Sequence, residues 1–111
     1  MKIELTPQDS TVVYSNETYD VIDNTFLNDL TLSKTSLHIG RSTRGHRHEG
    51  QEEIYFFEGG CGTMELGEES FHVQAGDIIA ISDGLFHKVV THGYAPGDLT
   101  FTTVFNGKRG T

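Results

Sequence analysis

The sequence is poor in features that several classes of protein depend on. It has a single cysteine, Cys61, so it cannot form an internal disulfide, and this fits a reducing compartment. No apolar run approaches the ~20 residues that a membrane-spanning helix needs. The segment Met1–Ser10 contains Lys2 but lacks the apolar stretch of a secretory signal peptide. We therefore expect a cytoplasmic protein that does not cross a membrane.

Basic residues are also scarce, with 8 Lys and Arg against 16 Asp and Glu and a formal net charge of −8. An acidic chain without a basic stripe repels phosphate backbones, so we expect no nucleic-acid partner. A length of 111 residues suits one domain covering residues 1–111. A domain of this size can bury a core without disulfide staples.

Helical periodicity is missing as well, because no stretch repeats apolar residues at i, i+3, i+4 and i+7 over two turns. The one weak helical candidate is a single turn over Asn24–Leu30, which Asn24 could cap. Proline occurs only at Pro7 and Pro96, whereas glycine occurs 13 times. The composition thus favours strands and turns over helices.

Short runs of β-branched and aromatic residues take the place of helices. Turn residues such as Gly59-Gly60 and Asp83-Gly84 separate most of these runs. Closing or doubling such a sheet removes its exposed edges, so the pattern predicts an all-β sandwich or barrel. The predicted strands are Ser10–Tyr14, Tyr19–Asp23, Leu30–Ile39, Glu53–Phe57, Cys61–Leu66, Phe71–Gln74, Ile78–Ile81, His87–Thr91 and Leu99–Phe105.

Three histidines and one glutamate form the constellation with the clearest chemistry. His46 and His48 are two residues apart, so in a β-strand their imidazoles project from the same face. Glu53 follows five residues later, and His87 comes after a turn and another strand. All four could face inward from neighbouring strands of one sheet. Three imidazoles and a carboxylate suit Fe(II), Mn(II), Ni(II), Co(II) or Zn(II), whereas Ca(II) prefers more oxygen ligands.

These residues lie in a pattern that resembles the first motif of the cupin superfamily. The pattern runs Gly40, five residues, His46-x-His48, four residues, Glu53, six residues and Gly60.

A second pattern is similar to the second cupin motif, and reads Gly76, five residues, Ser82-Asp83-Gly84, two residues, His87, three residues and Thr91. The family usually has Pro at the position of Ser82 and Asn at that of Thr91. The first departure touches a turn. The second weakens any substrate-orienting role for Thr91, which still offers a hydroxyl.

The resemblance implies a double-stranded β-helix, or jelly roll, a cupin-type barrel with a divalent transition metal inside. It places His46, His48, Glu53 and His87 at the metal-ligand positions. Among small single-domain members, the chain looks most like proteins labelled sugar-phosphate isomerase-like.

The carboxylate has one competitor, Glu52, because adjacent strand residues face opposite sides of a sheet. With Glu52 as the ligand, Ile54 would share its face, and with Glu53 as the ligand, Tyr55 would. The Gly-x-Gly turn after this strand aligns better with Glu53, and a tyrosine suits a polar pocket. We predict Glu53 and leave Glu52 as the alternative.

The remaining histidines and the cysteine lack such partners in the sequence. We expect His38, His72 and His92 to be ordinary strand or surface residues. Cys61 has no neighbouring base that would activate it as a nucleophile.

The site predicts metal binding better than it predicts a reaction. We expect a metal-dependent enzyme acting on a small polar metabolite such as a sugar or sugar phosphate, in an isomerase-like reaction. A non-catalytic, metal-anchored binding module and an Fe(II) dioxygenase are the alternatives, because fold resemblance does not select among them.

Substrate-binding and catalytic roles have only candidates. A phosphate group would need a cationic anchor, and three arginines near the first motif are available: Arg41, Arg44 and Arg47. Isomerisation also needs a general base. Candidates for that role are Glu52, Tyr55 and His38, and we assign none of them as catalytic.

We expect a homodimer, because small cupins often pair and an edge strand favours pairing with a second chain. The candidate pairing segments are Lys2–Leu5 and Ser10–Tyr14.

Overall fold

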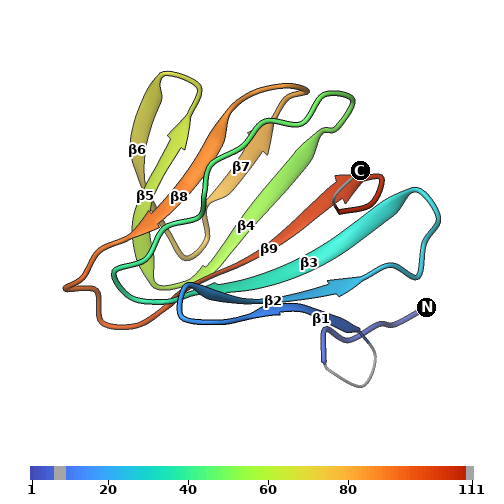
Figure 1. Cartoon of the computed structure of the whole chain (residues 1–111), viewed down its shortest axis with the longest axis horizontal. Coiled ribbons are helices and arrows are strands. Elements are labelled where there is room, and N and C mark those ends of the chain that lie inside the picture. The colour runs from blue at the N-terminus through green and yellow to red at the C-terminus, as the bar shows by residue number, and fades with distance from the viewer. Residues whose placement is uncertain (7–9, 110–111) are drawn as a thin grey trace.

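The regular secondary structure consists entirely of strands, as shown by a computed structural model that describes residues 1–6 and 10–109 (Figure 1). Nine strands occur within these ranges: β1 (Thr11–Ser15), β2 (Tyr19–Asn24), β3 (Leu30–Leu37), β4 (Glu53–Gly59), β5 (Cys61–Leu66), β6 (Glu69–Gln74), β7 (Ile78–Ile81), β8 (His87–Thr91) and β9 (Leu99–Asn106). The predicted all-β class is confirmed, and the strands coincide with the predicted runs to within a few residues.

The weak helical prediction for Asn24–Leu30 is wrong. Asn24 ends β2, and its side-chain Oδ1 accepts a hydrogen bond from the Phe26 N–H at 3.1 Å. This is the local turn that asparagine favours, and it competes with a helical cap. The segment therefore forms the bend that leads into β3.

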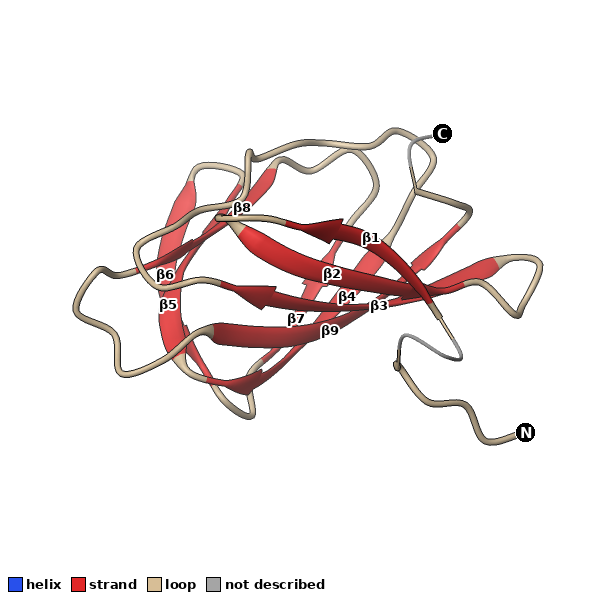
Figure 2. Cartoon of the chain, turned by 60° about the horizontal axis from the view of Figure 1, so that its bottom comes forward, coloured by secondary structure: helices blue, strands red, loops and turns tan. Residues whose placement is uncertain are grey.

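The strands form two antiparallel sheets that face each other in a jelly roll (Figures 1 and 2). The larger sheet has the order β1-β2-β3-β9-β4-β7, and the smaller has the order β6-β5-β8. The loop between β3 and β4 runs along the outer edge of β8, as its trace in Figure 1 shows. The Thr43 N–H donates to the Val89 carbonyl at 2.9 Å, and the Thr91 N–H donates to the Arg41 carbonyl at 2.9 Å. This loop therefore extends the smaller sheet.

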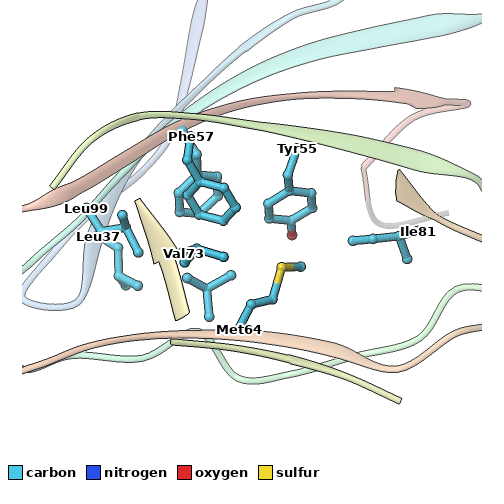
Figure 3. Packing of buried hydrophobic residues seen from close by; sticks show 9 residues of the cluster. Leu37, Tyr55, Phe57, Met64, Val73, Ile81 and Leu99 are labelled. Atoms are coloured by element: carbon cyan, nitrogen blue, oxygen red, sulfur yellow. The ribbon is translucent and has the colours of Figure 1, made fainter. Parts of the chain in front are cut away.

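One end of the barrel interior is apolar, because strand alternation turns a set of aliphatic and aromatic side chains inward. Leu37 pairs with Leu99 across β3 and β9, and both are fully buried. Met64 reaches from the opposite sheet toward Tyr55 in the packed cluster of Figure 3. Burying each such side chain contributes about 2 kcal/mol, so this end stabilises the fold.

The same strands become polar toward their other end. Ser33 pairs with Thr103 across β3 and β9, and Asp23 pairs with Ser33 across β2 and β3. All three side chains are buried. On β4, the register places Glu53 opposite Phe105, near this polar end. The barrel therefore has one apolar half for packing and one polar half that can receive a ligand.

Of the two segments proposed for pairing in a homodimer, one forms a strand and the other does not. The predicted strand Ser10–Tyr14 corresponds to β1, which is an edge of the larger sheet, whereas Lys2–Leu5 lies outside the strands. Homodimer formation itself stays a prediction. Within the described ranges, no helix is long and apolar enough to cross a membrane.

The turn between β4 and β5 depends on Gly60, and this gives a first prediction. Gly60 has a φ of 78°, and a Cβ at this position would collide with the Asp98 carbonyl. Gly40 has a similar φ of 76°, but its Cβ would meet only the Gly93 Cα at 3.5 Å. We expect Gly60→Ala to lower the free energy of unfolding by about 2–4 kcal/mol, through backbone strain plus the collision.

Gly40→Ala is the matched control, and backbone strain alone should lower its stability by about 1 kcal/mol. Urea unfolding followed by circular dichroism measures both values. Equal losses for the two variants would show that the Asp98 carbonyl does not limit this turn.

Candidate metal centre

Three of the predicted ligand residues converge at the polar end of the barrel. Candidate ligand atoms of His46, Glu53 and His87 all lie within 4.8 Å of one another, which is close enough to hold one metal ion. The ring centroids of His46 and His87 are 4.3 Å apart. The Glu53 Oε1 atom is 3.4 Å from the His87 Nε2 atom.

Backbone pairing between the β3–β4 loop and β8 brings the two histidines together. The His46 N–H donates to the His87 carbonyl at 3.0 Å, and the His87 N–H donates to the His46 carbonyl at 2.9 Å. His46 therefore takes part in an isolated bridge, and neither it nor His48 lies in one of the nine strands. Gly45, with a φ of 77°, interrupts the extended conformation just before the bridge.

The expectation that all four residues come from neighbouring strands of one sheet is wrong. Glu53 begins β4 in the larger sheet, and His87 begins β8 in the smaller one. The candidate site therefore joins the two sheets, because the closed barrel brings their inner faces together.

His87 is oriented in the way that metal-binding histidines usually are. Its ring is buried, and Nδ1 lies 3.0 Å from the Leu85 carbonyl oxygen. A carbonyl only accepts hydrogen bonds, so Nδ1 carries the proton and a neutral ring has its lone pair on Nε2. A hydrogen bond of this kind from the outer ring nitrogen fixes the ring of a metal-binding histidine.

The inner nitrogen of His87 meets an electron-rich group. Nε2 is buried and has no hydrogen-bond partner among the described residues. Its 3.4 Å separation from Glu53 Oε1 does not have hydrogen-bond geometry. A lone pair facing a carboxylate is unfavourable unless a cation or proton lies between them, and unsatisfied buried groups of this kind are rare. The residues therefore fit a metal ion bound by nitrogen and oxygen.

His46 is prepared to act as a neutral ligand. The pKa of His46 is lowered to about 4, mainly by loss of hydration and also by the nearby His87 and His48, against the opposing effect of Glu53. A metal ion needs the deprotonated imidazole, so protons compete weakly for this ring at neutral pH.

His48 lies beside the cluster and outside its tightest part. Its ring centroid is 4.4 Å from that of His46 and 6.5 Å from that of His87. The 4.8 Å group contains the other three predicted residues. A four-ligand centre that includes His48 therefore stays a prediction.

The geometry favours Glu53 over Glu52 as the carboxylate. The Glu53 side chain is 11% exposed and faces His87. Glu52 is exposed, and its backbone N–H donates to the Asn106 Oδ1 atom at 2.7 Å. Strand β4 begins at Glu53, and residues two apart in a strand share a face, so Tyr55 and Phe57 point inward with Glu53.

A cavity of about 250 Å³ adjoins the cluster, and His46, His48 and Glu53 line it. Thr35 and Thr103 contribute polar atoms to its wall. A second cavity of about 540 Å³ lies between the N-terminal residues and the end of β2, away from the histidines. The smaller cavity is therefore the one that contains candidate metal ligands.

Tyr55 is the general-base candidate that lines this cavity. Burial raises its pKa well above the usual value, and the negative charge of Glu53 adds to that shift. Its hydroxyl therefore stays protonated and donates rather than accepts a proton. His38 is held elsewhere, with Nδ1 2.9 Å from Asp98 Oδ2, and Glu52 is exposed.

Among the three predicted phosphate anchors, Arg44 lines the cavity. Arg41 forms an exposed ion pair with Glu17 at 3.7 Å, and Arg47 is exposed. His72 is exposed on β6, and His92 lies 3.3 Å from the Thr63 hydroxyl, away from the cluster.

Arg109 is a cavity residue that the sequence analysis missed. Its Nε and Nη2 atoms donate to the two carboxylate oxygens of Asp23 at 2.7 and 3.1 Å, and Nη2 also donates to Ser33 Oγ at 2.9 Å. Burial lowers the Arg109 pKa, but the hydrogen bonds and charge of Asp23 outweigh that effect and raise it. Arg109 lies outside both motifs, so no local pattern marked it.

The hydrogen bond at the Leu85 carbonyl predicts the tautomer of His87. In metal-free protein at about pH 8, above the ordinary histidine pKa, we expect Nδ1 to carry the proton and Nε2 to be bare. Long-range ¹H–¹⁵N correlation spectra distinguish the two nitrogens. The exposed His72 is the control and should show a mixture of tautomers. Finding the His87 proton on Nε2 would contradict this orientation of the ring.

Comparison with other proteins gives both a sequence relative and fold relatives. The chain is 36% identical over 66 residues to uncharacterized protein MJ1618 of Methanocaldococcus jannaschii, a match that covers 60% of this chain and 53% of that protein. The chain thus spans about half the length of the curated relative it matches.

Solved structures share the fold at low identity. KdgF from Halomonas sp. has a TM-score of 0.81 at 16% identity and covers 99% of this chain and 97% of its own. An RmlC-like cupin from Shewanella frigidimarina has a TM-score of 0.77 at 14% identity, covering 99% and 94%. A predicted oxalate decarboxylase from Thermotoga maritima has a TM-score of 0.73 at 21% identity, covering 96% and 98%.

The cupin domain family matches residues 34–104, which include both motifs and all four predicted ligand residues. This match covers more than half of the chain, and the jelly roll and the histidine–glutamate cluster agree with it. The chain belongs to the cupin family.

Proposed function

We propose that this protein binds one divalent transition-metal ion through His46, His48, Glu53 and His87. We further propose that it uses the ion on a small polar metabolite with an acidic group, such as a sugar phosphate, in an isomerase-like reaction. The observation that carries the proposal is the buried His87 Nε2 atom, which faces the Glu53 carboxylate without a hydrogen bond.

The donor set supports an ion of borderline softness. Imidazole nitrogens with one carboxylate suit Fe(II), Mn(II), Co(II), Ni(II) or Zn(II). Such an ion, when bound, polarises a carbonyl or hydroxyl oxygen as a Lewis acid. Because the histidines are neutral, the single carboxylate offsets only part of a dication's charge, and the centre would attract an anionic ligand.

The cavity supports a small substrate. Its volume of about 250 Å³ is below the roughly 300–1,000 Å³ of pockets that hold drug-sized ligands. Hydroxyl groups on Thr35 and Thr103 offer hydrogen bonds to a polyol. Aromatic rings such as Phe101 complete the wall. A molecule the size of a monosaccharide matches this space.

Two arginines support a negatively charged group on that molecule. Arg44 and Arg109 both line the cavity, and the Asp23 carboxylate holds the guanidinium of Arg109 in a fixed orientation. Guanidinium groups bind carboxylates and phosphates with directional hydrogen bonds. The protonated Tyr55 hydroxyl, in the same cavity, supports a role as a proton donor rather than a base.

Metal binding is the first test. Protein stripped with a chelator and supplied with Mn(II), Fe(II), Co(II), Ni(II) or Zn(II) should take up one ion per chain, as measured by elemental analysis and titration calorimetry. Because each variant removes a donor atom, we expect His87→Ala and Glu53→Gln to weaken binding by about 100-fold or more. His72→Ala, on the exposed face of β6, is the control and should bind as the wild type does. If the wild-type chain takes up no ion, the proposal fails.

Substrate charge is the second test. Metal-loaded protein should bind mannose 6-phosphate more tightly than mannose. Arg109→Gln should weaken only the phosphate complex, by about 10–100-fold, because it removes a charged hydrogen-bond donor and still offers an amide to Asp23. Arg41→Ala, outside the cavity, is the matched control.

Turnover assays then identify the reaction. Conversion of an aldose phosphate to its ketose by the wild type, with loss of activity in His48→Ala, supports the isomerase proposal. Oxygen consumption points instead to a dioxygenase, and tight binding without turnover points to a binding module. Equal affinity for the neutral and phosphorylated sugars would contradict the anionic substrate class.

A further inference from the structure

We propose that Asn106 is a positioning residue for the metal centre, which it sets without touching the ion. The inference rests on the proposed function, because it concerns the segment that joins two of the proposed ligands, His48 and Glu53. Residues 47–52 lie outside any strand, so sheet hydrogen bonds do not fix this part of the loop. Side chains and one backbone hydrogen bond from elsewhere in the chain hold it.

Asn106 uses both ends of its amide on the backbone of this loop. Its Nδ2 donates to the Gly50 carbonyl at 2.9 Å, and its Oδ1 accepts the Glu52 N–H at 2.7 Å. The side chain of Gln51 returns a third bond from Nε2 to the Asn106 carbonyl at 2.8 Å. This clasp needs a donor and an acceptor on one short side chain, which an amide has and a carboxylate lacks.

The turn of the second cupin motif also holds this loop. The Gly84 N–H donates to the His48 carbonyl at 3.0 Å, and the Gly50 N–H donates to Asp83 Oδ1 at 2.7 Å. The loop is therefore anchored at His48, at Gly50 and at Glu52, directly before Glu53.

The anchor at Asn106 is itself placed by the larger sheet. Asn106 ends β9, where it pairs with Leu30, and its neighbour Phe105 pairs with Glu53 across β4. The strand register thus sets the distance between the clasp and the carboxylate. The Asn106 residue is exposed and is not among the residues that line the cavity, whereas His48 and Glu53 are.

A clasp of this kind should control metal affinity. Groups that orient metal ligands typically change affinity by about 10–100-fold when they are removed. A shift of the loop by a fraction of an ångström would change the separation of His48 from Glu53, and metal centres tolerate little misplacement.

Asn106→Ala and Asn106→Asp test the proposal with Co(II) as the probe, because its visible absorption also reports the ligand geometry. We expect Asn106→Ala to weaken Co(II) binding by about 10–100-fold in titration calorimetry. Asn106→Asp keeps the acceptor for Glu52 but loses the donor to Gly50, so its affinity should be intermediate. The Co(II) spectrum should change in both variants.

Asn16→Ala is the matched control, because it also removes two hydrogen bonds between a side-chain amide and the backbone. Asn16 Oδ1 accepts the Thr18 N–H at 2.9 Å and the Tyr19 N–H at 3.0 Å in the β1–β2 turn. We expect Asn16→Ala to bind Co(II) like the wild type. An equal loss of affinity in Asn16→Ala and Asn106→Ala would indicate a general stability effect and overturn the inference.

A second measurement tests the clasp in metal-free protein. Amide hydrogen exchange at Glu52, measured by NMR on metal-free protein, should be faster in Asn106→Ala and unchanged in Asn16→Ala. If Asn106→Ala does not fold, Asn106→Asp carries the Co(II) comparison, because it removes only the donor to Gly50. Wild-type affinity in the Asn106 variants overturns this inference alone, whereas a wild-type chain that binds no ion overturns the proposed function and this inference with it.

Discussion

The two backbone hydrogen bonds between His46 and His87 are the contact on which the rest of the site depends. They fasten an irregular loop to the edge of β8, and they bring two imidazoles to a centroid separation of 4.3 Å. Glu53 then meets both rings from the opposite sheet. A metal centre built this way needs the barrel to be closed, because its donors come from two different sheets.

Inside the barrel, the same strands carry apolar residues at one end, which stabilise the fold, and polar residues at the other end, which line the candidate site. At one end of β3, Leu37 faces Leu99 and contributes apolar burial. Four residues earlier, Ser33 faces Thr103 in a row that is equally buried but polar. Buried polar groups cost stability unless they are hydrogen-bonded, so a cavity at this end comes at the expense of packing. The apolar half compensates for it.

The polar half of the barrel contains a buried ion pair. Asp23 is 5% exposed and pairs with Arg109, and such pairs add little net stability because both partners lose hydration. The Arg109 guanidinium also lies 5.4 Å from the Phe105 ring, which holds the cation against the cavity wall. The unsatisfied His87 nitrogen and the Arg109–Asp23 pair thus place nitrogen and oxygen groups at the polar end of the barrel.

Strand positions and inward faces followed from the sequence, because residue alternation and turn glycines are local signals. The position of the Gly-x-Gly turn favoured Glu53 over Glu52, and motif spacing pointed to His46 and His87, which lie together with Glu53 in the folded chain. The contacts of Arg109 and Asn106 could not be predicted from local sequence patterns. Arg109 binds Asp23 across 86 positions, and Asn106 clasps a loop more than 50 positions away. Contacts at that separation are set by the register of β9 against its neighbours, which only the folded barrel determines.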